Sequence, residues 1–206
     1  MARRADLLEF AVLGLLHESP MHGYELRKRL NTALGAFRAL SYGSLYPCLR
    51  GLLTKSWIVA PPTAPGPSGS RRARIVYELT ADGKEQFQAV AGAAGPSAWD
   101  DDGFDVHFAF FARTTAEVRL RILEGRRSRL EERLATIRAT SARNRERMDA
   151  YTTALQRHGE ESAEREVRWL EELIVAERSA PPAPPGPSTP PNGTTSPTLS
   201  TTQNQE

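Results

Sequence analysis

Residues 41–52 read SYGSLYPCLRGL and form the stretch that decides the fold. The leucines of this stretch recur at helical spacing and define one apolar face. The opposite face is small or polar and carries Gly43, Ser44, Pro47 and Arg50. Ser41 stands where an N-cap residue is expected, so the pattern predicts a helix over residues 42–54 whose outer face can approach another surface closely.

Two helices are predicted before this stretch. Residues 7–17 are apolar on nearly every side, which requires burial all round, either in the protein's own core or against a second subunit. Residues 23–34 have apolar and basic residues on opposite sides, and Gly35 follows as a C-terminal cap. Tyr24 is interpreted mainly as an inward-facing core residue of this second helix.

Two short strands are predicted after the stretch, over residues 57–60 and 74–79, because both segments are rich in β-branched and aromatic side chains. The segment between the strands is rich in Pro, Gly and Ser and ends in basic residues. This arrangement is typical of the wing that follows a helix-turn-helix. Thr80 is the expected N-cap of a further helix over 81–91.

The C-terminal half is predicted to be helical. A long helix is expected from 115 to 157, ended by Gly159, with a last helix over 160–177. Apolar residues with polar interruptions recur every seven positions, as in an antiparallel bundle or a loose coiled coil. The two interleaved sets are Leu123, Leu130, Ile137, Asn144 and Tyr151, and Arg127, Leu134, Ser141, Met148 and Leu155.

Charge is unevenly spread along the 206 residues, although the net charge is only +2. Residues 1–80 contain 11 Lys and Arg against 5 Asp and Glu, whereas the remainder contains 16 against 20. A basic N-terminal region suits a polyanionic partner, although chance scatter of charge is an equally good explanation from this observation alone.

Several classes of protein are not expected. A single cysteine excludes an intrachain disulfide, the four histidines lack ligand spacing, and no apolar run is long enough to span a membrane. No phosphate-binding Gly-rich loop, nucleophile elbow or metalloprotease motif is present. We therefore expect a cytoplasmic, nucleoid-associated protein that is not an enzyme and uses no cofactor or metal.

The predicted fold is mainly α with a small β wing: an N-terminal winged helix-turn-helix and a C-terminal antiparallel, coiled-coil-like helical dimerisation domain. The expected boundaries are 1–91 for the winged helix and 92–114 for a linker with a short apolar helix. The dimerisation domain is expected over 115–178. Residues 179–206 form a Pro/Ser/Thr-rich tail predicted to be disordered, because such a composition buries too little surface to offset the entropy of ordering.

Such a winged helix predicts binding to double-stranded DNA, because a helix fits the major groove, where base edges can be read. The predicted contacts from the third helix are Tyr42, Ser44, Tyr46, Pro47 and Arg50. Phosphate contacts are expected from Lys28, Arg29 and Lys55, and wing contacts from Arg71, Arg72 and Arg74.

The segments LEFAVLGLL, HGYELRKRL, SYGSLYPCLRGL and RRARIVYELTADGKEQF together resemble the PadR family of bacterial transcriptional regulators. The resemblance covers residues 7 to 88 and is strongest in the Ser-x-Gly-Ser-Leu-Tyr-Pro block. It implies a homodimeric winged helix-turn-helix, most often a repressor, released from DNA by a small molecule or another cue. The alternatives are an activator, or a winged helix used as a protein-binding adaptor.

Two further residue sets are predicted for the proposed dimer and effector. The aromatic residues after the winged helix either line an effector pocket or simply pack the two domains together, and packing is favoured. This set is Trp99, Phe104, His107, Phe108 and Phe111. The expected dimer interface is Leu8, Val12, Leu123, Leu130, Leu134, Ile137, Met148, Tyr151, Leu155, Leu170 and Ile174.

Overall fold

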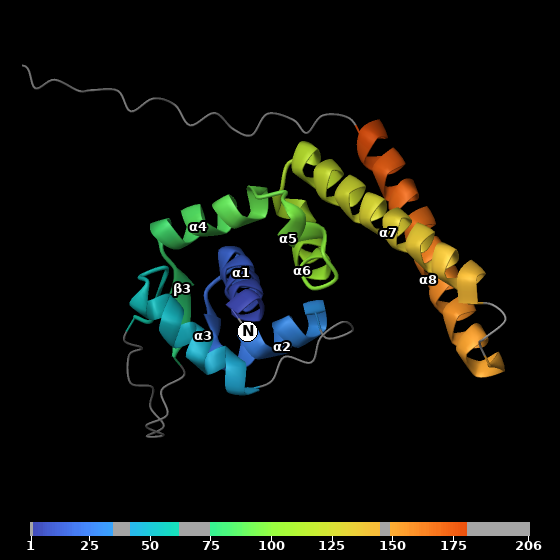
Figure 1. Cartoon of the computed structure of the whole chain (residues 1–206). Helices are drawn as coiled ribbons and strands as arrows, with labels where there is room; N and C mark the ends of the chain where they lie inside the picture. Colours follow the sequence, from blue (N-terminus) through green and yellow to red (C-terminus); the bar gives the residue numbers. More distant parts are fainter. Residues whose placement is uncertain (1, 35–41, 62–74, 145–148, 181–206) are drawn as a thin grey trace, which may run out of the picture.

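The computed structural model describes residues 2–34, 42–61, 75–144 and 149–180. It is mainly helical, with one small antiparallel sheet, as the sequence predicts. An N-terminal unit of helices surrounds α1, and a hairpin of two long helices lies to one side of it (Figure 1). The predicted disordered tail falls outside the described residues except for Ser179 and Ala180.

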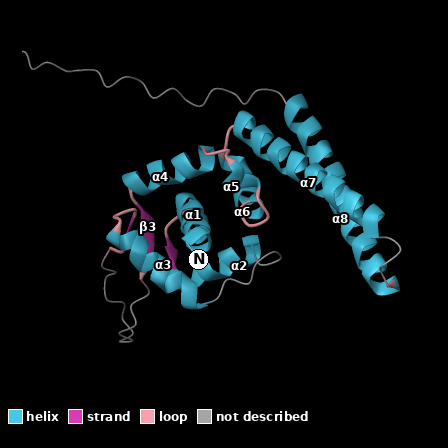
Figure 2. Cartoon of the chain, viewed as in Figure 1, coloured by secondary structure: helices cyan, strands magenta, loops and turns pink. Residues whose placement is uncertain are grey.

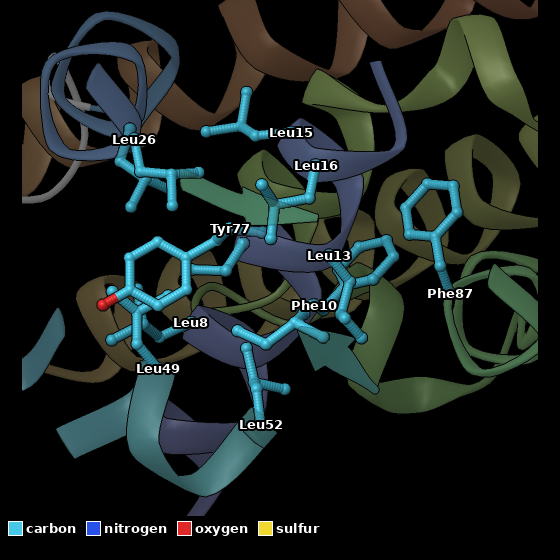
Figure 3. Close-up of a cluster of buried hydrophobic side chains, with 14 of the residues drawn as sticks. Leu8, Phe10, Leu13, Leu15, Leu16, Leu26, Leu49, Leu52, Tyr77 and Phe87 are labelled. Atoms are coloured by element: carbon cyan, nitrogen blue, oxygen red, sulfur yellow. The ribbon is translucent and has the colours of Figure 1, made fainter. Parts of the chain in front are cut away.

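Helix α1 (Ala2–Glu18) is the centre of the N-terminal unit. Every residue from Phe10 to Leu16 is buried, because α2 (Gly23–Leu34), α3 (Tyr42–Thr54), α4 (Ala81–Gly92) and the sheet all pack on α1. Figure 3 shows its leucines meeting side chains from α2, α3 and α4. The all-round apolar pattern of this helix is therefore satisfied within one chain.

Three short strands form the sheet, in the order β1-β3-β2 and with antiparallel pairing throughout. Strand β2 (Ile58–Val59) and strand β3 (Val76–Leu79) are the predicted wing strands, and Ile58 pairs with Leu79. Strand β1 (Met21–His22), between α1 and α2, was not predicted. Figure 2 shows how little of the chain is strand.

Both ends of the segment between α3 and α4 are fixed by helix caps. The N–H of Ser56 donates to the carbonyl of Leu53, and the N–H of Trp57 donates to that of Leu52. These two bonds form a Schellman motif, which directs the chain from α3 into β2. Thr80 accepts a hydrogen bond from the N–H of Gly83, which confirms the predicted N-cap of α4.

The C-terminal half is a hairpin of α7 (Ala116–Asn144) and α8 (Ala150–Ser179). Arg119 pairs with Glu177 at one end, and Ser141 donates to Gln156 near the other, so the helices run antiparallel. The prediction of one helix through residue 157, ended by Gly159, is wrong. Gly159 lies inside α8, and an added Cβ there would meet nothing within 4 Å, so the residue is simply an exposed helical glycine.

Three short elements connect the two halves: α5 (Pro96–Trp99), α6 (Phe104–Ala109) and the 3₁₀ turn η1 (Phe111–Arg113). One side of α6 places Val106 in the core around α1, where Phe110, the residue that follows the helix, is also buried. Its other side places Phe104 and Phe108 against the hairpin, where both rings contact Trp169. This six-residue helix therefore belongs to both hydrophobic cores.

Candidate nucleic-acid interface

Helix α3 is anchored by one side and open on the other. Leu45, Leu49 and Leu52 are buried in the core that Figure 3 shows in part. Its outward residues are Gly43, Ser44, Tyr46, Pro47 and Arg50, and all of them are exposed. The helix continues through Pro47, which lies on this outer side. Tyr42 begins the helix, but its side chain lies outside the described residues.

Arg50 is an exposed cation on this outer face. Among the ion pairs of the described residues, none involves its guanidinium, and only its backbone carbonyl is engaged, by the hydroxyl of Thr54. An exposed guanidinium offers a planar set of donors suited to two acceptors at once. The predicted base-contacting residues Ser44, Tyr46, Pro47 and Arg50 are thus brought to one helix surface.

Two of the predicted phosphate contacts are already engaged in ion pairs. Lys55 lies 2.7 Å from a carboxylate oxygen of Glu9, and its ammonium is 4.6 Å from the ring centroid of Trp57. Arg29 pairs with Glu18 at 3.0 Å and with Glu25 at 3.3 Å. Since carboxylates offset the charge of both residues, we expect weaker phosphate contacts from them than the sequence suggested.

Lys28 is the predicted phosphate contact that stays exposed, with no carboxylate partner among the residues that the structure describes. Tyr24 lies one turn away on α2, and 72% of its surface is exposed, so its interpretation as a core residue is wrong. Helical spacing could have predicted this exposure. Leu26 and Leu30 lie on the buried face of α2, and Tyr24 lies on the opposite face.

The wing is described only at its base. Strands β2 and β3 pair as predicted, so the segment between them leaves and re-enters the same sheet. Arg71, Arg72 and Arg74 fall outside the described residues, and their contacts therefore remain a prediction.

A hollow of about 1030 Å³ lies between α2, α3 and β3. Exposed aromatic and aliphatic side chains border it: Tyr24 of α2, Tyr46 of α3 and Ile75, which directly precedes β3. Tyr77 lies at its base, and burial raises the pKa of that phenol. The outward faces of α2 and α3 thus open onto one shared depression.

Comparison with known proteins identifies this unit. Residues 12–89 match the family model described as the transcriptional regulator PadR-like family. Over these residues the chain is similar to PadR-like regulators, and the N-terminal unit of α1–α4 with its sheet is called the PadR-like domain below. The match contains α2, α3 and the wing strands, together with the C-terminal part of α1 and most of α4.

Individual relatives extend the comparison. The negative transcriptional regulator PadR of Bacillus subtilis (strain 168) is 29% identical over 81 residues, which are 39% of this chain and 43% of that protein. The alignment thus spans less than half of the curated relative. Among solved structures, Bacillus subtilis PadR in complex with operator DNA aligns with a TM-score of 0.40 and 19% identity, covering 82% of this chain and 98% of that one. The same regulator in complex with p-coumaric acid gives 0.39 and 18%, covering 84% and 99%.

Of the five residues predicted for an effector pocket, four pack in the hydrophobic cluster beside the hairpin, and His107 packs in the other core. The ring of His107 is buried against Phe10 of the PadR-like domain, with 4.7 Å between ring centroids. Phe108 and Phe111 contact each other near α8, at 4.9 Å, and Phe104 packs beside them. Trp99 lies against Gly125 of α7. These contacts support the packing interpretation, which the sequence favoured.

Most residues predicted for a dimer interface are buried within one chain. Leu8 and Val12 lie in the core of the PadR-like domain, which corrects their assignment to a contact surface. The buried hairpin residues are Leu123, Leu130, Leu134, Leu170 and Ile174. Ile137 is half-buried, whereas Tyr151 and Leu155 are 89% and 71% exposed. Met148 lies outside the described residues.

The described residues also bear on three other possibilities: a metal site, a membrane-spanning helix and a reactive thiol. Within them, no three His, Cys, Asp or Glu side chains gather as metal ligands, and no helix is both long and apolar enough to cross a membrane. Burial, assisted by the carboxylate of Glu9, raises the pKa of the Cys48 thiol to about 12. Such a thiol is protonated at neutral pH and is a weak nucleophile.

Proposed function

We propose that this chain is a sequence-specific, DNA-binding transcriptional regulator that acts as a homodimer. The observation that carries the proposal is the surface of α3 within the PadR-like domain. Its inner side is fixed in the core, while Ser44, Tyr46 and Arg50 are presented outward on a rigid helix. In this proposal α3 enters the major groove of double-stranded DNA.

Arg50 is the residue we assign to base reading. A guanidinium can donate to both acceptors of a guanine edge in the major groove, and such a pair discriminates between bases. The small residue Gly43 and the flat ring of Pro47 lie on the same side of α3 and allow close approach of the helix to the base edges. Arg71, Arg72 and Arg74 are assigned to the DNA backbone or the minor groove.

The proposed dimer doubles the number of bases read, which a single winged helix needs for useful specificity. Tyr151 and Trp169 are about five helical turns apart and therefore share one side of α8 with Leu155 and Leu173. Tyr151, Leu155 and Trp169 are exposed, and Leu173 is half-buried. We propose this stripe, with Ile137, as the contact surface in place of the buried leucines.

We further propose that the regulator is a repressor and that a small molecule modulates its binding to DNA. The matched relative is named a negative regulator, which supports the sign of regulation. We also propose that the chain acts in the cytoplasm at the nucleoid, and the proposed DNA-binding role requires neither catalysis nor a cofactor.

The test starts from the full chain and a library of random DNA duplexes, with repeated rounds of retention and sequencing. We expect enrichment of a two-fold symmetric site whose half-sites lie about one helical turn, roughly 34–36 Å, apart. Placing that site in a reporter promoter then gives the sign of regulation. Retention without any enriched site would point instead to an adaptor or to nonspecific binding, and would overturn the proposal.

A further inference from the structure

Arg126 of α7 is a buried cation, with only 8% of its surface exposed. Its Nε donates to Glu166 of α8 at 2.8 Å. Its Nη1 donates to the carboxylate of Asp101 at 2.6 Å and to the backbone carbonyl of Trp99 at 3.4 Å. The guanidinium also lies 5.4 Å from the ring centroid of Phe104. One side chain of α7 thus contacts α8, the end of α5, the turn between α5 and α6, and the start of α6.

Two further arginines repeat this arrangement along α7. Arg119, seven residues before Arg126, pairs with a carboxylate of α8 and donates to the carbonyl of Phe111 in η1. Arg133, seven residues after Arg126, lies 3.6 Å from a carboxylate oxygen of Asp101. Seven residues make about two helical turns, so the three arginines lie on one side of α7. That side of α7 therefore holds the connecting segment, which consists of α5, α6 and η1.

The ion pairs of Arg126 are directional, whereas the apolar contacts around them are not. The contacts of Phe104 and Phe108 with Trp169 depend on buried area and tolerate small shifts. A buried guanidinium is tolerated only where its donors meet acceptors, so displacement of the turn would leave a charge unpaired. The hydrogen bond from Arg126 lowers the pKa of Asp101, which keeps both partners charged at neutral pH. The connecting segment therefore has one favoured position on α7.

The connecting segment is also tied to the PadR-like domain. Val106 of α6 lies in the core around α1, and His107 packs on Phe10. In η1, Arg113 lies 3.4 Å from a carboxylate oxygen of Glu18 at the end of α1. Figure 1 shows α5 and α6 between α1 and α7. The position of the connecting segment on α7 therefore sets the orientation of α3 relative to the hairpin.

We infer that Arg126 is a positioning residue for DNA recognition, because it decides which spacing of half-sites the proposed dimer accepts. The inference rests on the proposed function and deepens it. In that proposal the hairpins join the two protomers, and α3 of each protomer reads one half-site. Arg126 acts on this reading through the connecting segment rather than through a contact with the bases.

Arg126→Met is the first test, because methionine fills the buried space without a charge. The two carboxylates left behind stay hydrated, since the side chains of Asp101 and Glu166 are 55% and 32% exposed. Binding of the full chain is measured to the duplex selected from the random library, and to duplexes whose spacer between half-sites is one base pair longer or shorter. One base pair rotates a half-site by about 35°, since a turn holds about 10–10.5 base pairs. We expect the parent to lose about tenfold or more in affinity at either altered spacing, and Arg126→Met about threefold or less.

Two further variants separate positioning from stability. Asp101→Ala removes the carboxylate of the turn and leaves Arg126 paired with Glu166, and we expect it to relax the dependence on spacing in the same way. Glu164→Ala is the matched control, because it breaks an ion pair with Arg138 between the same two helices of the hairpin. Glu164→Ala should keep the parental dependence on spacing. Thermal melting of every form shows whether stability has changed as well.

A second measurement needs no DNA. Nitroxide labels are attached at Gln88→Cys on α4 and Glu132→Cys on α7, both exposed positions, in a chain that also carries Cys48→Ala. Labelled chains are diluted into unlabelled chains, so that the measured distances lie within one protomer. We expect a narrow distribution of distances in the parent and in the matched control, and a wider distribution in Arg126→Met.

The outcomes separate the two proposals. If the parent discriminates between spacings, and Arg126→Met and Asp101→Ala do so equally well, the positioning role is overturned and the proposed function stands. An unchanged distribution of label distances in Arg126→Met overturns the positioning role as well. A parent that enriches no two-fold symmetric site overturns both proposals.

Discussion

Ser56 is the residue at which backbone geometry and sequence disagree most. Its φ is 58°, the one positive value among non-glycine residues of the described ranges. The position is the C′ residue of the Schellman motif that ends α3, where glycine is usual because a Cβ is costly in the left-handed region. The side chain of Ser56 is exposed, and its backbone carbonyl accepts from the Thr80 hydroxyl.

Replacing Ser56 with glycine should therefore stabilise the fold. We expect Ser56→Gly to raise the free energy of unfolding by about 1 kcal/mol, since the backbone cap is kept and the strain is removed. Urea unfolding measures this change. Ser56→Val, which adds a branched Cβ at the same φ, is the matched control and should lower stability; equal stabilities for all three forms would contradict the account.

His107 is a second residue whose environment has a measurable consequence. Its side chain is 5% exposed and lies against Phe10. Burial lowers the pKa of this imidazole to about 4 from an ordinary 6.5, and the nearby Asp100 opposes the shift. The folded protein therefore keeps His107 neutral over a pH range in which the unfolded chain protonates it.

The sign of the resulting pH dependence follows directly. Below pH 6.5 the unfolded state binds a proton that the folded state does not, so stability falls as the pH is lowered towards 4. The contribution lost is of the order of 3 kcal/mol, at about 1.4 kcal/mol per unit of pKa difference. Unfolding by urea across this range should show it, and His107→Leu should flatten the curve. His158→Gln, at an exposed position, should leave the curve unchanged.

At the scale of elements, local sequence predicted α2 and α3 to the residue, because apolar spacing and end signals coincide there. Local sequence did not predict where α7 ends and α8 begins. Gly159 was read as a break, yet one exposed glycine costs only about 1 kcal/mol against alanine and a 30-residue helix absorbs it. The usable signal was Asp149, whose carboxylate accepts from the N–H groups of Tyr151 and Thr152 at the start of α8.

The candidate interface was predictable in part for a similar reason. Residues of α3 were placed correctly because helical phase decides exposure once the buried leucines are known. The ion pairs of Arg29 with Glu18 and of Lys55 with Glu9 were not predictable, since both carboxylates reach them from another helix. The short strand β1 was missed because two residues are too few to show the alternation of apolar and polar side chains that predicts a strand.

Two glycines of the hairpin should respond to alanine in opposite directions. At Gly125 an added Cβ would lie 2.5 Å from the Trp99 ring, so Gly125→Ala should destabilise the protein by about 1–3 kcal/mol through overpacking. At Gly159 there is open space, and alanine should stabilise α8 by about 0.5–1 kcal/mol. Thermal melting of the two variants beside the parent is the measurement; shifts of the same sign would contradict the packing described.

For α3, the prediction concerns specificity. Arg50→Ala should weaken binding to the selected duplex by about 1–3 kcal/mol and relax the preference at one base pair per half-site. Binding to random-sequence DNA should fall much less. Since Arg50 is exposed, the variant should fold like the parent, and unchanged binding to the selected site would show that the reading face lies elsewhere.

At the scale of the whole molecule, the exposed apolar stripe proposed as the dimer contact lies on α8. We expect a homodimer in light scattering at micromolar concentration. Leu155→Asp should shift the population towards monomer without lowering the stability of the monomer, because Leu155 is 71% exposed. Leu170→Ala, at a fully buried position, should instead destabilise the monomer by about 2–5 kcal/mol. A parent that is monomeric at these concentrations would refute the dimer.

The position of α6 in two cores gives the molecule a mechanical property. Val106 fixes this helix to the PadR-like domain and Phe104 fixes it to the hairpin, so a rotation of one half is transmitted to the other through the same short helix. In a dimer that is held together by the hairpins, a rotation of the PadR-like domain about α6 moves α3. A small rotation there changes the distance between two recognition helices, and DNA fixes that distance at about one helical turn. In the proposed dimer, the spacing of the two recognition helices then depends on the stiffness of one short helix, α6.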